Sequence, residues 1–212
     1  MKLLDLYCKA GGASMGYHQA GFEVVGVDIK KQKNYPYEFI QADALEVLKD
    51  DNFVSQFDVI AASPPCQTHT ALKHLRNAQG RTTNKLDLIA DTRELLIKTK
   101  KTYVIENVPG SPLRDFVQIC GSAFGLKVRR HRWFESNMLE LVGSQCDHKW
   151  QGKPIGVYGS MNDEIPNGGH TAKTLDEAKL AMGIEHMTWR ELVEAIPPAY
   201  TRFIGFQLKA RL

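Results

Sequence analysis

Short apolar segments alternate with segments of helical composition along most of this chain, and that alternation constrains the fold more than any other feature. The segments expected to be strands are Leu3–Tyr7, Phe22–Val27, Glu38–Ala42, Phe57–Ala62 and Thr102–Ile105. The segments expected to be helices between them are Ala13–Ala20, Asp43–Leu48 and Leu86–Lys98. Strands that alternate with helices in this way pair in parallel and are covered on both faces. The sequence therefore predicts an α/β fold built on a doubly wound, mostly parallel sheet.

The pattern weakens after the fifth expected strand. We expect a helix over Pro112–Phe124 and a hairpin-like pair of strands over Lys127–Glu135. From Ser136 to Lys173 glycines and prolines interrupt the chain, which predicts a small insert with at most a few short strands. Helices are expected to resume at Thr174–Met182, Thr188–Ala195 and Ala199–Leu212.

Length and composition allow one ordinary globular domain. The chain has 212 residues, of which 43% are hydrophobic, enough for one good core and too few for two full domains. Its formal net charge of +3 permits a polyanionic partner without requiring one. No apolar run approaches the roughly 20 residues of a membrane helix, and a strand is expected directly after Met1-Lys2. The start of the chain therefore leads us to expect no signal peptide. The four cysteines have no paired spacing, which is typical of a protein in the reducing cytoplasm.

The tetrapeptide Pro64-Pro65-Cys66-Gln67 follows the fourth expected strand. The carboxyl edge of an α/β sheet is where ligands bind, and the two prolines stiffen the loop that holds the cysteine. A thiolate in an exposed, polar setting of this kind is reactive. Cys66 is therefore the candidate nucleophile, whereas Cys8 and Cys120 have apolar neighbours and are expected to be inert buried thiols.

Three further motifs accompany this tetrapeptide. In chain order they are Asp5-Leu6-Tyr7-Cys8-Lys9-Ala10-Gly11-Gly12, Glu106-Asn107-Val108 and Arg129-Arg130-His131-Arg132-Trp133-Phe134. Their order and spacing resemble the DNA (cytosine-5) methyltransferase family, from Leu3 to about Phe134 and again from about Ala178 onward. The resemblance implies a Rossmann-like fold that binds S-adenosylmethionine, methyl transfer to carbon 5 of cytosine in DNA, and flipping of the target base. It also implies a catalytic domain over residues 1–135 and 174–212, with residues 136–173 as a small recognition insert.

The candidate catalytic residues are Cys66, Glu106, Arg130 and Arg132. A thiolate that adds to carbon 6 of cytosine makes carbon 5 nucleophilic, and a carboxylic acid at the N3 edge neutralises the charge that develops. Glu106 fits the second role, although it could instead be a surface residue at a strand end. Arg130 and Arg132 alternate on an expected strand, so both should lie on one face. The resemblance places such a pair beside the flipped base, and a solvated basic edge strand is the alternative.

A second set of residues is expected to bind the cofactor. The glycine pair after the first strand lets backbone N–H groups approach a carboxylate at a helix amino terminus. Asp28 ends the second strand, where it could bind both ribose hydroxyls or remain a solvated loop residue. Asp43 could accept the adenine amino group or simply cap the helix that follows. With the positions implied by the resemblance, the set comprises Tyr7, Lys9, Gly11, Gly12, Asp28, Ile29, Asp43, Ala44, Pro64, Glu194 and Ala195.

Three residues depart from the family pattern. Lys9 replaces the first glycine of the cofactor turn, Glu194 replaces an asparagine, and Val128 replaces a glutamine two places before Arg130. Because the family folds the first two positions together, Lys9 and Glu194 should lie within an ion-pair distance of roughly 4 Å. The pair could be purely structural. Alternatively, the lysine could repel the sulfonium of S-adenosylmethionine and attract a carboxylated donor, carboxy-S-adenosylmethionine, which would give carboxymethylcytosine.

Two other features bear on ligands and partners. Thr68–Lys85 carries four Lys and Arg residues and no Asp or Glu, so this loop could close over a nucleic-acid backbone. The spacing of Cys146, His148 and His170 fits no standard zinc pattern, and we expect no metal site there. A cytosine in RNA or in a free nucleotide is an alternative substrate. A non-catalytic nucleic-acid-binding or partner-dependent subunit is the alternative from a different class.

Overall fold

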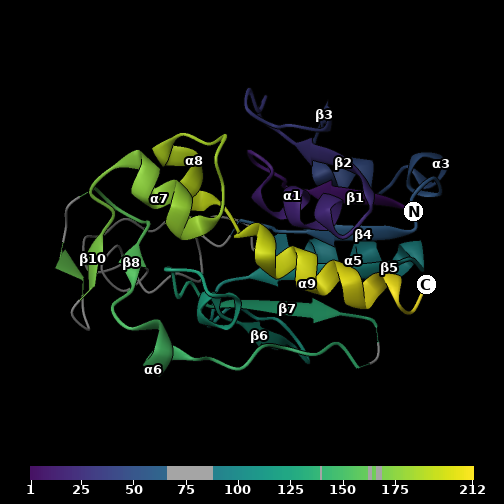
Figure 1. The fold of residues 1–212 in the computed structure, drawn as a ribbon. Coiled ribbons are helices and arrows are strands. Elements are labelled where there is room, and N and C mark those ends of the chain that lie inside the picture. The colour runs from purple at the N-terminus through teal and green to yellow at the C-terminus, as the bar shows by residue number, and fades with distance from the viewer. Residues whose placement is uncertain (66–87, 139, 162–163, 166–168) are drawn as a thin grey trace, which may run out of the picture.

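The computed structural model describes residues 1–65, 88–138, 140–161, 164–165 and 169–212. Within this part of the chain, a seven-stranded central sheet has the order β3-β2-β1-β4-β5-β7-β6 (Figure 1). Its strands are β1 (Lys2–Leu6), β2 (Glu23–Asp28), β3 (Glu38–Gln41), β4 (Val59–Ala62), β5 (Thr102–Asn107), β6 (Val117–Ile119) and β7 (Arg132–Ser136). The first five in the spatial order run parallel, whereas β7 is antiparallel to both β5 and β6. The predicted α/β fold with a doubly wound, mostly parallel sheet is confirmed.

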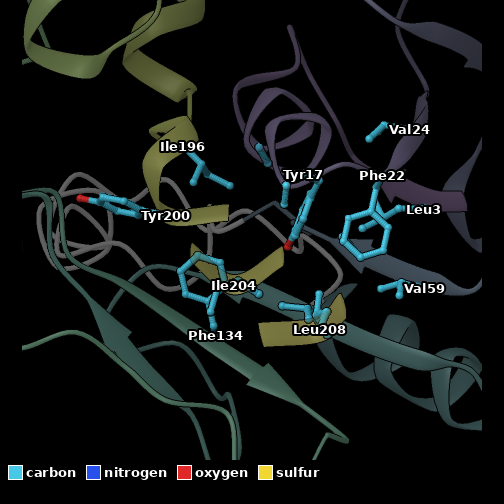
Figure 2. Packing of buried hydrophobic residues seen from close by; sticks show 14 of the residues in the cluster. Leu3, Tyr17, Phe22, Val24, Val59, Phe134, Ile196, Tyr200, Ile204 and Leu208 are labelled. Carbon is cyan, nitrogen blue, oxygen red and sulfur yellow. The ribbon is translucent and has the colours of Figure 1, made fainter. Parts of the chain in front are cut away.

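Helices cover both faces of the central sheet. They are α1 (Gly12–Gln19), α2 (Ala44–Val47), α3 (Asp51–Val54), α5 (Leu88–Thr99) and α9 (Pro198–Lys209). Successive strand residues point to opposite faces, so neighbours in sequence belong to different cores. Leu3 joins the buried cluster formed with Tyr17 of α1 and Ile204 of α9, which Figure 2 shows. Leu4 joins a second cluster on the other face, which includes Leu96 of α5.

A smaller sheet lies on the side of the molecule away from both termini (Figure 1). Its described strands are β8 (Ile155–Gly156), β9 (Glu164–Ile165) and β10 (Gly169–Thr171), and the helices near it are α6 (His148–Gln151), α7 (Leu175–Met182) and α8 (Trp189–Glu194). Val157 and Ala172, which follow β8 and β10, are buried in one cluster with Met182 of α7 and Leu192 of α8. The insert therefore packs directly on the helices that follow it. No helix in the described ranges is long and apolar enough to cross a membrane.

Two predicted elements were wrong. Pro112–Phe124 is not a helix: it contains β6 and a short 3₁₀ helix, Gly121–Phe124. Val117 and Ile119 alternate along an edge strand that pairs with β7, and Ile119 is fully buried in the sheet core. This tertiary pairing overrides the local helical preference. Lys127–Glu135 does not form a hairpin with itself, because only its end lies in β7 and the antiparallel partner is β6. The short helices α3 and α6 were not predicted.

Candidate active site

A cavity of about 230 Å³ lies at the carboxyl ends of β1, β4 and β5. The chain leaves β1 toward β2 on one side of the sheet and leaves β4 toward β5 on the other, which is the position where open α/β sheets bind ligands. The residues that line this cavity come from β1 and the turn after it, the start of α1, the start of the loop after β4, the end of β5, the first residue of β7, and α8 with the residues that flank it. From the predicted site, the residues that line it are Tyr7, Lys9, Gly12, Pro64, Glu106, Arg132, Glu194 and Ala195.

The turn after β1 packs directly against the segment before α9. A Cβ atom at Gly12 would lie 2.6 Å from the carbonyl oxygen of Ile196, so only glycine permits this approach. The approach brings the side chain of Glu194 over the turn, where its Oε2 lies 3.2 Å from Nζ of Lys9. The predicted ion pair between Lys9 and Glu194 is confirmed. Lys9 has φ of 50°, so the lysine retains the left-handed backbone conformation for which glycine is favoured.

A buried carboxyl group, Asp5, lies in the same cavity and was missed in the sequence analysis. Its side chain is 1% exposed and accepts a short hydrogen bond from Ser14, whose hydroxyl accepts another from Tyr35 at 3.0 Å. Burial raises the pKa of Asp5 to about 7, and the charges of Glu106 and Asp28 act in the same direction. Among the described residues, Oδ1 of Asp5 has no hydrogen-bond partner. A single acid in an otherwise apolar strand was the sequence signal that could have identified it.

Glu106 lies at the end of β5 and is only 7% exposed, so it is not a surface residue. Its Oε1 lies 2.9 Å from Nε of Arg132, the first residue of β7. Burial raises the pKa of Glu106, while the Arg132 guanidinium and a hydrogen bond from Ser63 oppose the rise. A carboxyl group in this environment can hold a proton closer to neutral pH than an exposed one can.

Arg130 does not share a strand face with Arg132, which corrects the prediction. Its backbone has φ of 37°, which is incompatible with a continuing strand, and β7 begins only at Arg132. The Arg130 guanidinium donates to the carbonyl oxygens of Val157, at 2.9 Å, and Val193. Arg130 therefore links the insert to α8, while Arg132 alone of the two lines the cavity. Val128, the other departure in this region, is buried in the third core.

Asn107 connects the end of β5 to the loop that carries the candidate nucleophile. Its Nδ2 donates to the carbonyl oxygen of Pro64 at 3.0 Å, and its Oδ1 accepts from the backbone N–H of Val108 at 2.9 Å. Asn107 is 2% exposed, so both bonds are shielded from water. Cys66, Gln67 and the basic loop Thr68–Lys85 lie outside the described residues, and Pro65 is the last residue before them to line the cavity.

The acidic residues predicted to bind the nucleoside lie outside the cavity lining. Both carboxylate oxygens of Asp28 accept backbone N–H groups, from Lys9 at 3.1 Å and from Lys30 at 2.9 Å, so Asp28 braces the turn. Ile29, beside it, is 63% exposed. Asp43 caps α2 by accepting from the N–H of Leu45 at 2.8 Å, which confirms the capping alternative. Gly11 adopts a left-handed conformation and Ala44 begins α2, and their contacts with a cofactor stay predictions.

The cysteines and histidines are arranged differently from the expectation. His170 lies 3.0 Å from Glu177 and apart from the other candidate ligands, whereas Cys146 and His148 lie beside His131 and Cys120. The predicted burial of Cys120 is confirmed, and its thiol also contacts Nε2 of His148 at 3.3 Å. Cys8 is buried, and burial raises the pKa of its thiol far above the usual value, consistent with an inert side chain.

The sheet order, the glycine turn and the cavity at the switch point define a Rossmann-like α/β methyltransferase fold. A family model for C-5 cytosine-specific DNA methylases matches residues 1–115, and the chain belongs to this family. It is 30% identical over 128 residues to the Type II methyltransferase M.HgiGI of Herpetosiphon aurantiacus, covering 56% of this chain and 98% of that protein.

Two further similarities complete the comparison. The chain is 28% identical over 121 residues to the Type II methyltransferase M.NgoPII of Neisseria gonorrhoeae; the match covers 52% of this chain and spans 34% of that protein. Among solved structures, an E. coli prophage protein described as a candidate DNA modification methyltransferase superposes with a TM-score of 0.67, covering 99% of both chains at 14% identity. At that identity the superposition supports the fold alone.

Proposed function

We propose that this protein transfers a methyl group from S-adenosylmethionine to carbon 5 of cytosine in DNA through a covalent adduct with Cys66. The observation that carries the proposal is the buried pair of Glu106 and Arg132, which faces the cavity beside Pro64 and Pro65 in a member of this family. An acid with a raised pKa, held next to the loop of a candidate thiol nucleophile, is the arrangement that this chemistry requires.

The charges of the cavity fit the proposed cofactor. The residues that line it include the acids Asp5, Glu106, Glu191 and Glu194 and the cations Lys9 and Arg132. S-adenosylmethionine carries a sulfonium and an ammonium group against one carboxylate, so an acidic lining attracts it. The ammonium would also give the buried Oδ1 of Asp5 the donor that it lacks among the described residues. When bound, the cofactor supplies an electrophilic methyl group.

Four residues of the chain have distinct roles in the proposed reaction. The Cys66 thiolate adds to carbon 6 of the flipped cytosine, which makes carbon 5 nucleophilic. Glu106 holds a proton at the N3 edge and so neutralises the charge that develops, while Arg132 fixes the orientation of its carboxyl group. After transfer, loss of the carbon 5 proton allows the thiolate to leave. Asn107 holds the preceding Pro64 carbonyl and thereby the start of the nucleophile loop.

DNA that contains 5-fluorocytosine tests this mechanism directly. Fluorine cannot leave as a proton does, so the protein should become covalently attached to the DNA in the presence of S-adenosylmethionine. Cys66→Ser should abolish the attachment and keep the fold, which circular dichroism can verify. Attachment that survives Cys66→Ser would exclude Cys66 as the nucleophile. Digestion of unsubstituted product DNA to nucleosides, followed by mass spectrometry, identifies the modified base.

Carboxy-S-adenosylmethionine is the alternative donor, and the position of Lys9 at the cavity favours it. Lys9 lines the cavity, and its ammonium group could bind the extra carboxylate of this donor, although its ion pair with Glu194 offsets part of the charge. The two donors should be mixed in one reaction and the products separated by mass. Methylcytosine as the only product, with the carboxylated donor in excess, would exclude this alternative. Lys9→Gly with unchanged donor preference would show that Lys9 is not the selector.

We further propose that DNA, rather than RNA or a free nucleotide, is the substrate and that residues 136–173 form the recognition insert. The basic loop Thr68–Lys85 would contact the phosphate backbone. Neutralising Arg76 and Arg81 together should weaken DNA binding and flatten its salt dependence. With fewer phosphate contacts, the variant releases fewer counterions from the DNA when it binds. Cofactor affinity should be unchanged, and an equal loss of both would indicate misfolding. Parallel reactions with RNA and with cytidine nucleotides test the alternative substrates.

A further inference from the structure

Four side chains with metal-ligating atoms converge outside the candidate active site. They are Cys120, His131, Cys146 and His148, called the Cys₂His₂ cluster below, and their ligand atoms all lie within 4.8 Å of one another. We propose that the Cys₂His₂ cluster binds one structural zinc ion, which joins the insert to the edge of the central sheet.

The contacts inside the cluster alternate between sulfur and nitrogen. Sγ of Cys120 lies 3.3 Å from Nε2 of His148, and Sγ of Cys146 lies 3.2 Å from Nε2 of His131. The two imidazole rings are inclined at 65° with their centroids 5.2 Å apart. Tetrahedral ligands at ordinary zinc bond lengths, about 2.3 Å to sulfur and about 2.0 Å to nitrogen, lie roughly 3.3–3.8 Å from one another. The cluster therefore has nearly the dimensions of a zinc site, and small side-chain shifts would complete it.

The donor set selects the ion. Two thiols and two imidazoles suit zinc, whereas calcium and magnesium require oxygen ligands. Four protein ligands leave no open coordination position, which is the arrangement of structural rather than catalytic zinc. Two thiolates also neutralise the charge of the ion, so binding would place no net charge at a site where Cys120 is fully buried.

Two serine hydroxyls hydrogen-bond Cys120 and connect it to the segment that carries Cys146. The Ser122 hydroxyl lies 3.1 Å from Sγ of Cys120 and accepts from the backbone N–H of Asp147 at 2.9 Å. The Ser144 hydroxyl accepts from the backbone N–H of Cys120 at 3.1 Å. Outer hydrogen bonds of this kind hold the ligands of metal sites in place. Here they also tie the Ser144–Asp147 segment to the segment around Cys120 before any ion is bound.

The location of the cluster indicates what the ion would do. Cys120 follows β6 and His131 precedes β7, so both belong to the antiparallel edge of the sheet. His148 is the first residue of α6 and Cys146 lies two residues before it, so both belong to the insert, and α6 lies below that edge in Figure 1. His131 is adjacent to Arg132, which pairs with Glu106. A bound ion would thus hold the α6 region of the insert against the edge of the sheet and stabilise the start of β7, where Arg132 lies.

Zinc analysis of protein produced without a histidine tag tests the proposal. Plasma mass spectrometry should find about one zinc per chain. Co²⁺ added to metal-free protein should give the absorption bands of a tetrahedral site with thiolate ligands. Cys146 is exposed, so Cys146→Ser should fold. Its loss of zinc affinity should exceed the roughly 10–100-fold that changes to outer hydrogen-bond partners cost. His131→Asn should also fold and lose zinc affinity to a similar extent. The matched controls Cys8→Ser and His170→Asn should keep the metal and the spectrum.

Three results would overturn the proposal. One is unmodified protein that contains no zinc and gives no cobalt spectrum, which requires no variant to fold. Another is a Cys146→Ser variant that binds metal as well as Cys8→Ser does. The third is a disulfide between Cys120 and Cys146 in freshly purified protein, found by peptide mass spectrometry without reduction. None of these measurements involves DNA or a methyl donor, so their outcome is independent of the proposed function.

Discussion

The ammonium group of Lys9 lies 3.2 Å from a carboxylate oxygen of Glu194, so the two charged residues that bring the turn after β1 and the end of α8 together compensate each other. Both side chains are about half exposed, at 46% and 60%, and such a pair contributes no more than about 1 kcal/mol to stability. The left-handed backbone conformation of Lys9 offsets the stabilisation from the ion pair, because a side chain in that conformation costs roughly 1–2 kcal/mol relative to glycine.

We therefore expect Lys9→Gly to keep or raise the free energy of unfolding, by up to about 1 kcal/mol, as strain relief offsets the lost ion pair. Urea denaturation measures the change. Lys9→Ala is the matched control, because it removes the ion pair and keeps the Cβ atom. It should be less stable than Lys9→Gly, and the reverse order would show that the turn is not strained.

Asp5 should make stability depend on pH. Burial raises its pKa in the folded protein to about 7 from an ordinary value of 3.8, so the folded state binds more protons than the unfolded state between these values. The contribution of Asp5 is therefore most favourable below about pH 4 and is lost as pH rises toward 7. Relative to Asp5→Asn, the unmodified protein should lose a few kcal/mol across this window. Asp115→Asn, the same change at an exposed site, should run parallel to the unmodified protein in urea titrations at each pH.

Replacing Glu135 by alanine should destabilise the fold strongly. Its carboxylate accepts from Nε and Nη2 of Arg93 at 2.6 and 2.7 Å and from the backbone N–H of Arg114 at 2.7 Å, and the Arg93–Glu135 pair is about 95% buried. Removal of one partner leaves a buried charge without compensation, which costs about 3–5 kcal/mol. The exposed pair of Glu140 and Arg211 supplies the control: Glu140→Gln should cost less than about 1 kcal/mol. Similar losses in thermal unfolding would contradict the role given to burial.

Asn107→Ala should slow covalent trapping of the protein on DNA that contains 5-fluorocytosine. The substitution removes the donor to the Pro64 carbonyl, so the loop that carries Cys66 loses its attachment to β5. A displacement of about 1 Å at a reacting group can reduce a rate by about a hundredfold. Asn137→Ala removes hydrogen bonds at the other end of β5, to Tyr103 and Lys101, and should leave the trapping rate intact. Equal slowing in both variants would reduce Asn107 to a general structural role.

Local patterns predicted the parts of this fold that depend on local interactions. The apolar runs of β1, β2 and β4 mark strands because those strands are buried on both faces. Glu106 was assigned to the site because its motif matches the family pattern and a carboxylic acid fits the proposed chemistry. The ion pair of Lys9 and Glu194 could be predicted only because the family pattern supplied the long-range contact.

Features that depend on pairing between distant segments were missed. Nothing in Val117–Ile119 alone distinguishes an edge strand from a helix, because its partner β7 comes later in the chain. Arg130 breaks the expected strand to reach carbonyl groups of the insert and α8. The Cys₂His₂ cluster draws its ligands from three separate segments, so its sequence spacing matches no compact metal-binding motif. Asp5 was overlooked because its environment, rather than its residue type, makes it unusual.

The size of the insert leads to a prediction about recognition. Its described strands contain two or three residues each, and α6 contains four. Sequence is read mainly in the major groove, and a single helix or ribbon reads few base pairs. We therefore expect a short or relaxed target of about two to four base pairs. Sequencing of DNA modified by the purified protein decides this.

The same experiment can locate the reading surface. Trp150 on α6 is 82% exposed, so Trp150→Ala should broaden the modified sequences or weaken DNA binding without loss of stability, if this face of the insert contacts DNA. Leu180 on α7 is similarly exposed, at 81%, so Leu180→Ala is the matched control and should leave the modified DNA sequences unchanged. A fully specified site of about six base pairs would show that the insert reads more than its size suggests, or that a partner chain supplies the specificity.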